Sequence, residues 1–110
     1  MGNDTLNLID RVRLALRLKT NAFDSEIENL IASAKLDLKI AGIFNVSEDD
    51  PQIVTAIITY CKLNFGTPYE DSNMRKSYYQ NLKIAYDEQK AQLGMATGYT
   101  KWSEADVFTD

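Results

Sequence analysis

The sequence predicts an all-α fold, a small bundle of about four helices followed by an extended C-terminal tail. Apolar residues recur every three or four positions as far as Leu93, which is the spacing of a helix with one buried face. The stretches between them carry residues that end or begin helices, such as Gly42, Gly66 and the pair Asp50 and Pro51. A chain of 110 residues with 45% hydrophobic content fits one domain with a single core. We therefore expect a helical domain over residues 1–93 and a separate tail over residues 94–110.

The first helix is expected from about Leu6 to Leu18. Asp4 or Thr5 can accept hydrogen bonds from the free amides at its start, and Asn21 closes the helical stretch. Its buried stripe is predicted to consist of Ile9, Val12, Ala15 and Leu16.

The second helix is expected to begin near Asp24 or Ser25. Ser25 and Glu28 have the spacing of a capping box, and Gly42 can take the left-handed conformation that ends a helix. The predicted stripe consists of Ile27, Leu30, Ile31, Ala34, Leu38 and Ala41.

The third helix is expected over residues 51–65, with Asp50 as N-cap and Pro51 at the first helical position. Gly66 and Pro68 end it. Its apolar face is unusually wide, which favours a central and enclosed position in the bundle. That face comprises Ile53, Ile57, Tyr60, Cys61 and Asn64, flanked by Val54 and Ile58.

The fourth helix is expected over residues 73–93 and is rich in tyrosine. Tyr78 and Tyr79 are adjacent, so they point about 100° apart and cannot both face one core. We expect one of them to be exposed or to pack against a neighbouring subunit, and we select Tyr79. Gly94 ends the helix, whose predicted stripe is Met74, Tyr78, Leu82, Ala85, Tyr86, Gln89 and Leu93.

The tail carries large apolar residues without a helical period, among them Tyr99, Trp102, Val107 and Phe108. Aromatic residues flanked by polar ones suit docking on a neighbouring subunit. The alternatives are a flap that covers one end of the first two helices and a frayed terminus. Alternation over residues 99–102 predicts a short strand.

The residues that usually carry catalysis are scarce. The chain has no histidine, which is the commonest general base and zinc ligand, and its one cysteine, Cys61, has no obvious activating partner. The glycines stand at helix boundaries rather than in a phosphate-binding loop. The acidic clusters at residues 48–50 and 70–71 suit helix N-termini better than a calcium loop. We expect no enzyme activity, no cofactor and no metal.

The charge and hydropathy of the chain limit the classes of partner that it is expected to bind. The net charge is −4 and no basic half or tail exists to bind nucleic acid. The link between the second and third helices is too long for a helix-turn-helix, and Lys62 is the one cation of the helix that follows. The basic pairs Arg13 with Arg17 and Lys35 with Lys39 suit solvated faces, contact with an acidic partner, or DNA passing nearby. No apolar run approaches the roughly 20 residues that cross a bilayer, and no signal peptide begins the chain.

The order of parts resembles that of the head-tail connector, or adaptor, proteins of long-tailed bacteriophages and prophages. The resemblance covers about Leu6 to Leu93 and rests on packing and capping positions. The most distinctive of these positions are Asp24 and Glu26 beside the Leu30 and Ile31 stripe, the aspartates before Pro51, and the aromatic end of the third helix at Asn64, Phe65 and Gly66. The segments that carry it are LIDRVRLALRL, NAFDSEIENLIASAKLDLKIAGI, DDPQIVTAIITYCKLNFG and SYYQNLKIAYDEQKAQL.

The resemblance implies a structural protein that forms a dodecamer-like ring below the portal protein, extends the DNA channel, and joins the filled head to the stopper or tail completion protein. It implies a place in the virion neck after assembly in the bacterial cytoplasm, with duplex DNA close by but not specifically bound. A head-to-tail ring needs two different faces on each subunit, and our candidate interface residues are Tyr79, Tyr99, Trp102 and Phe108. The alternative is a small helical regulator that binds DNA or a protein partner.

Overall fold

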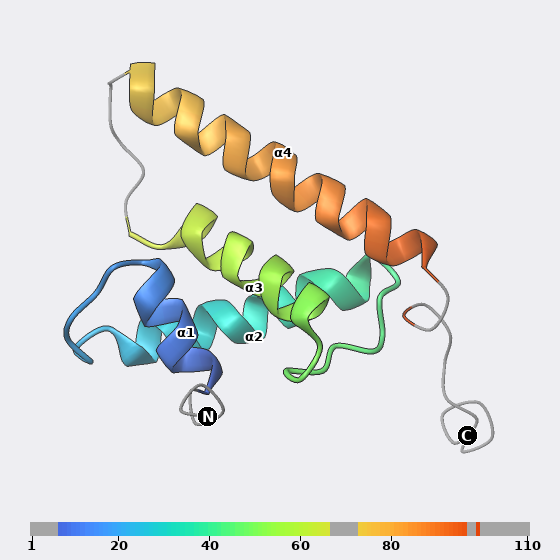
Figure 1. Ribbon diagram of the computed structural model, residues 1–110, viewed down its shortest axis with the longest axis horizontal. Helices are drawn as coiled ribbons and strands as arrows, with labels where there is room; N and C mark the ends of the chain where they lie inside the picture. Colours follow the sequence, from blue (N-terminus) through green and yellow to red (C-terminus); the bar gives the residue numbers. More distant parts are fainter. Residues whose placement is uncertain (1–6, 67–72, 97–98, 100–110) are drawn as a thin grey trace.

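The computed structural model describes residues 7–66, 73–96 and 99. These residues form four helices, α1 (Leu8–Ala15), α2 (Asp24–Ile40), α3 (Pro51–Asn64) and α4 (Asn73–Met95). α3 packs against both α2 and α4, and Figure 1 shows α1 at the end of the bundle where α2 begins. The all-α prediction is confirmed.

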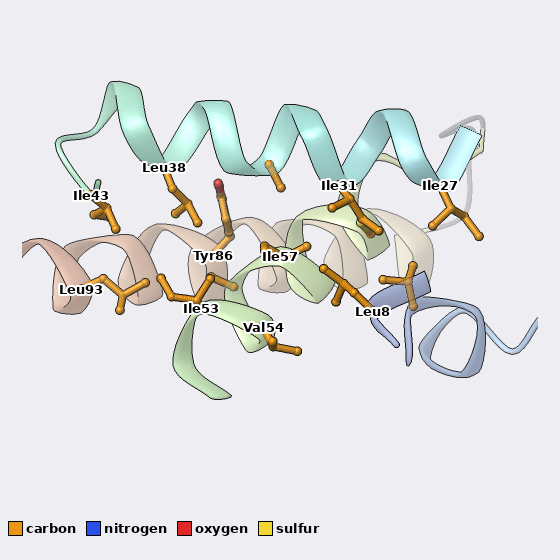
Figure 2. Packing of buried hydrophobic residues seen from close by; sticks show 14 residues of the cluster. Leu8, Ile27, Ile31, Leu38, Ile43, Ile53, Val54, Ile57, Tyr86 and Leu93 are labelled. Carbon is orange, nitrogen blue, oxygen red and sulfur yellow. The ribbon is translucent and has the colours of Figure 1, made fainter. Parts of the chain in front are cut away.

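All four helices contribute to one hydrophobic core, shown in Figure 2. The core is richest along α3, where Ile53, Ala56, Ile57 and Cys61 are completely buried. This confirms the predicted central position of the third helix. Removing these side chains from water is the main favourable contribution to folding. The complete buried set is Leu8, Val12, Ile27, Ile31, Ala34, Leu38, Ile43, Ile53, Val54, Ala56, Ile57, Cys61, Tyr86 and Leu93.

The start of α1 differs from the prediction. Asn7 is the N-cap: its side chain accepts a hydrogen bond from the Asp10 amide at 2.9 Å, and the Asp10 carboxylate accepts one from the Asn7 amide. The predicted caps Asp4 and Thr5 lie outside the described residues. The capping box satisfies two amides at once, so the first helical residue is Leu8.

α1 also ends three residues earlier than expected, at Ala15. Arg17 has a φ of 62°, in the left-handed region, and the Leu18 amide donates to the Arg13 carbonyl. The Arg17 amide donates to the Leu14 carbonyl, which completes a Schellman motif. Such motifs usually carry glycine at this position, so no residue near Arg17 indicated that the helix ends there.

The predicted capping box at the start of α2 is wrong. The N-cap is Phe23, and no side chain caps the helix there. The end of α2 is as predicted: Gly42 has a φ of 93°, and its amide and that of Ile43 donate back into the last turn. Ala41, expected in the buried stripe, is exposed because it lies beyond the last helical turn.

The start of α3 confirms the sequence interpretation. The Asp50 carboxylate accepts from the Gln52 amide at 2.8 Å, and Pro51 occupies the first helical position. Asn64, expected on the core face, is exposed and its amide group donates to the Tyr60 carbonyl. Gly66 adopts a φ of 77° just after the helix.

α4 begins at Asn73, as predicted, but ends two residues later than expected. It continues through Gly94 to Met95. Tyr86 and Leu93 are buried as predicted, but Tyr78 is 58% exposed and Tyr79 is half-buried. Tyr79 precedes the buried Tyr86 by seven residues, or two turns, so it is Tyr79 that shares the inward face. The side chain of Met74 lies outside the described part.

Candidate assembly surfaces

A polar contact fastens α4 to α2. The Tyr86 hydroxyl donates to the Asp37 carboxylate at 2.6 Å, and the Lys90 ammonium donates to the same carboxylate oxygen at 3.1 Å. The Lys90 nitrogen also lies 4.9 Å from the Tyr86 ring centroid. Tyr60 of α3 packs edge-on against Tyr86, with ring centroids 5.4 Å apart. One cluster therefore ties the last helix to both helices beneath it.

Burial and hydrogen bonding shift the pKa values of Tyr86 and Asp37 in this cluster. Burial raises the pKa of Tyr86, as does its hydrogen bond to Asp37. Burial also acts to raise the pKa of Asp37, but the hydrogen bonds from Tyr86 and Lys90 outweigh it, so the pKa of Asp37 is lowered. At neutral pH Asp37 is therefore an anion held by two donors.

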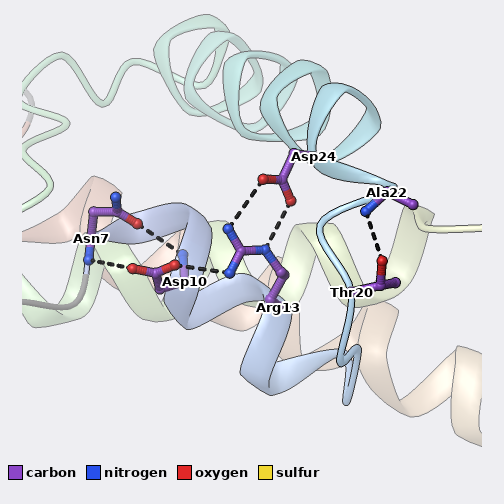
Figure 3. A network of polar contacts seen from close by, with 6 residues as sticks. All are labelled: Asn7, Asp10, Arg13, Thr20, Ala22 and Asp24. Atoms are coloured by element: carbon purple, nitrogen blue, oxygen red, sulfur yellow. Dashed lines mark hydrogen bonds and ion pairs between the residues drawn. The ribbon is translucent and has the colours of Figure 1, made fainter.

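A second polar contact fixes α1 against the start of α2 (Figure 3). The Arg13 guanidinium donates to both carboxylate oxygens of Asp24, at 2.8 and 3.1 Å, and to Asp10 at 2.9 Å. The hydrogen bond from Arg13 lowers the pKa of Asp24. A two-point contact of this kind fixes direction as well as distance. Arg13 therefore holds α1 against the start of α2 rather than presenting a free positive charge to solvent.

The remaining predicted basic positions differ in environment. Lys35 pairs with Glu48 at 2.6 Å. Arg17 and Lys39 are exposed, and neither has an ion pair within the described residues. Two of the four cations expected on solvated faces thus make internal ion pairs, Arg13 between α1 and α2 and Lys35 with the loop before α3. The pairs of Arg13 with Asp24 and of Lys35 with Glu48 could not be predicted from the sequence, because the partners lie 11 and 13 residues apart.

The start of the tail is attached to the bundle through Tyr99. Its hydroxyl donates to Asp50 at 2.5 Å, and its carbonyl accepts from the amides of Phe44 and Asn45. The hydrogen bond from Tyr99 lowers the pKa of Asp50. Asp50 therefore caps α3 with one oxygen and holds the tail with the other.

Of the predicted interface residues, Tyr99 thus contacts its own chain and Tyr79 is half-buried on the inner face of α4. Trp102, Phe108 and the rest of the expected strand lie outside the described residues. Tyr99 touches the loop between α2 and α3, whereas the flap alternative placed the tail over the first two helices.

Several large apolar side chains face outward. On α2, Leu36 and Ile40 are 58% and 76% exposed, and on α4, Ile84 and Met95 are 55% and 83% exposed. Leu14 and Phe23 are exposed near the link between α1 and α2. None of these residues was predicted as an interface residue. The signal was present on α2, where Leu36 and Ile40 lie outside the predicted core stripe.

The grooves of the described surface offer little for catalysis. The groove between the start of α3 and the end of α4 has a volume of about 290 Å³ and an uncharged lining of Pro51, Gln52, Thr55, Gln89, Gln92 and Leu93. Cys61 is buried, and burial raises the pKa of its thiol to about 12. Among the described residues, no three histidine, cysteine or acidic side chains gather as a possible metal site. The described helices include none with the length and hydropathy of a membrane span.

A protein-family model described as "Phage connector protein" matches residues 8–100, which is most of the chain. The chain belongs to the phage connector family. The match begins at the first residue of α1 and ends just beyond Tyr99, so it contains both polar contacts and the attachment of the tail. Neither the curated proteins nor the solved structures compared with this connector include a match.

Membership confirms the resemblance drawn from the four sequence segments. Proteins of this family are structural components of the phage particle and belong to its neck. The outward apolar residues of the connector are therefore candidates for contacts with other head or tail proteins.

Proposed function

We propose that this connector forms a ring below the portal, extends the DNA channel, and joins the DNA-filled head to the stopper or tail completion protein. The match to the phage connector family over residues 8–100 carries this proposal. The exposed apolar side chains on α2 and α4 support it, because a subunit of a closed ring must bury two different surfaces against its neighbours.

The segment after Tyr99 is proposed as an arm that contacts the next subunit or the portal. Tyr99 holds the start of this arm at Asp50, so residues 100–110 begin from a fixed point. Trp102 and Phe108 are its aromatic anchors. Tyr79 remains a proposed contact on α4, and the more exposed Tyr78 joins it.

The charge of the subunit suits a channel through which DNA slides. A strongly cationic bore would hold the phosphates through counterion release, whereas this chain has a net charge of −4. Arg13 and Lys35 also form ion pairs with Asp24 and Glu48, so they are less available to bind phosphates. We therefore propose proximity to duplex DNA without specific binding.

Replacing Trp102 by alanine tests the arm. The Trp102→Ala variant is expected to assemble less well while its helical content and melting temperature stay unchanged, measured by solution mass and circular dichroism. A Trp102→Ala variant that melts at lower temperature but assembles normally would place Trp102 in the core of its own subunit.

A further inference from the structure

The outward face of α2 lacks charge. Six exposed residues fall within an arc of about 100° opposite the buried stripe, and all six are uncharged. The six charged residues of α2 lie outside this arc. A solvent-facing helix surface is normally where charges gather. The arc consists of Ser25, Asn29, Ala32, Ser33, Leu36 and Ile40, and we call it the α2 face.

α4 has a comparable outward surface. Its exposed residues opposite Tyr86 and Leu93 fall within an arc of about 80°. They include one charged residue, Glu88, and two strongly exposed apolar ones, Ile84 and Met95. The arc consists of Ser77, Asn81, Ile84, Glu88, Ala91 and Met95, and we call it the α4 face.

The two faces point away from each other. α3 packs against both α2 and α4 (Figure 1), and both of these outer helices turn their buried stripes toward the shared core. The contact of Asp37 with Tyr86 and Lys90 fixes this arrangement. The α2 face and the α4 face can therefore each contact a different neighbouring molecule.

The charges at these faces favour unlike contacts over like ones. Lys39 borders the apolar end of the α2 face, one turn after Leu36, whereas the exposed Glu26 borders the polar end. Glu88 lies within the α4 face, one turn after Ile84. The Lys39 and Glu88 side chains are exposed and lack an ion pair among the described residues. A contact that joins the Leu36 and Ile40 ends of two α2 faces would bring Lys39 close to Lys39, and one centred on Glu88 of two α4 faces would oppose Glu88 to Glu88. An α2 face against an α4 face instead joins opposite charges.

We propose that the α2 face of one subunit docks on the α4 face of the next, with Lys39 and Glu88 forming an ion pair across the contact. Leu36 and Ile40 pack against Ile84 and Met95 in this contact. Because the two surfaces differ, the contact is head-to-tail and repeats around a ring rather than closing a two-fold dimer. The inference deepens the proposed function and rests on its ring.

Charge reversal tests the pair. Lys39→Glu and Glu88→Lys are each expected to raise the concentration needed for self-association about tenfold, and the double variant Lys39→Glu with Glu88→Lys to return it near the original value. Lys19→Glu, which makes the same charge change at an exposed loop residue, is the control. Single reversals that act no more strongly than Lys19→Glu, or a double variant as impaired as the singles, would overturn the ion pair.

Cross-linking tests the contact even if free subunits associate weakly. Leu36→Cys and Ile84→Cys subunits, purified separately and then mixed, are treated with a short bismaleimide. The native Cys61 is buried and should not react. We expect products that join one variant to the other to exceed greatly those that join like to like. Equal yields of all products, or none, would overturn the docking.

The failure of this inference is distinguishable from the failure of the ring. Closed rings that persist through both charge reversals and give no mixed cross-link would leave the proposed function intact and reject the docking. Mixed cross-links from a chain that forms only open filaments would support the docking and reject the ring.

Discussion

Tyr86 donates its buried hydroxyl to the carboxylate of Asp37 at 2.6 Å, joining two residues 49 positions apart in the chain. Lys90, one turn after Tyr86, donates to the same carboxylate. The three side chains set how α4 lies across the bundle, and so they set where the outward faces of α2 and α4 are presented. The internal polar contact is therefore a condition for the proposed assembly.

The Tyr86→Phe variant is expected to lose about 1–2 kcal/mol of unfolding free energy. The ring still fills its place against Tyr60, but a hydrogen bond to a charged group is lost. Urea denaturation measures the difference. Tyr78→Phe, which removes a hydroxyl from an exposed ring, should change stability by less than about 0.5 kcal/mol. Equal effects of the two variants would contradict the role given to Tyr86.

Stability should fall in acid below about pH 4. The folded state lowers the pKa values of Asp24, Asp37 and Asp50, so the unfolded chain binds protons more readily than the folded one. Their stabilising contribution is complete above the unfolded pKa and is lost as pH falls through the folded values. Denaturation from pH 6 to pH 2 should show this fall, and Asp37→Asn should show a shallower one. Parallel curves for the two proteins would contradict the assignment for Asp37.

The Arg17→Gly variant is expected to be more stable than the wild type by about 0.5–1 kcal/mol. Arg17 occupies a left-handed conformation, which is unfavourable for a residue with a side chain but not for glycine. Part of this gain is lost because glycine also increases the conformational entropy of the unfolded chain. Gly42→Ala makes the opposite change at the same motif of α2 and should destabilise by about 1 kcal/mol. Thermal melting compares both variants. An unstable Arg17→Gly variant would show that the Arg17 side chain makes a needed contact.

The Tyr99→Phe variant should release the tail without loosening the bundle. The hydroxyl that holds Asp50 is removed, whereas the Asp50 cap on α3 and the backbone hydrogen bonds of Tyr99 are kept. We expect faster tryptic cleavage after Lys101 with an unchanged melting temperature. Asp50→Ala, which removes the cap as well, should lower the melting temperature too. Cleavage at the wild-type rate in Tyr99→Phe would show that this hydroxyl does not hold the tail.

The existence and order of the four helices could be predicted because their core stripes have strong helical periods. The ends were predictable where ordinary signals operate, as at Asp50 with Pro51 and at Gly42. The helix ends were predicted wrongly where an uncommon residue takes the left-handed position, as Arg17 does after α1. They were also predicted wrongly where a residue able to cap a helix makes no capping hydrogen bond, as with Ser25. At the start of α4, Tyr78 and Tyr79 fit the helical period almost equally well. In the folded bundle Tyr79 lies on the inward face and Tyr78 is exposed.

The candidate assembly surfaces were less predictable than the fold. The family could be inferred from capping and packing residues, since these are what its members need in order to fold. The α2 face could have been found from the absence of charge opposite the core stripe. The contacts of Arg13 with Asp24 and of Tyr99 with Asp50 depend on how distant segments pack, which periodicity does not report.

The central claim is that this connector closes into a ring, and electron microscopy of the purified chain at high concentration, together with its solution mass, tests it most directly. We expect closed rings with a central hole wide enough for duplex DNA. A discrete dimer that retains duplex DNA at moderate salt, and loses it steeply as salt rises, would rule out the ring and favour the small DNA-binding regulator.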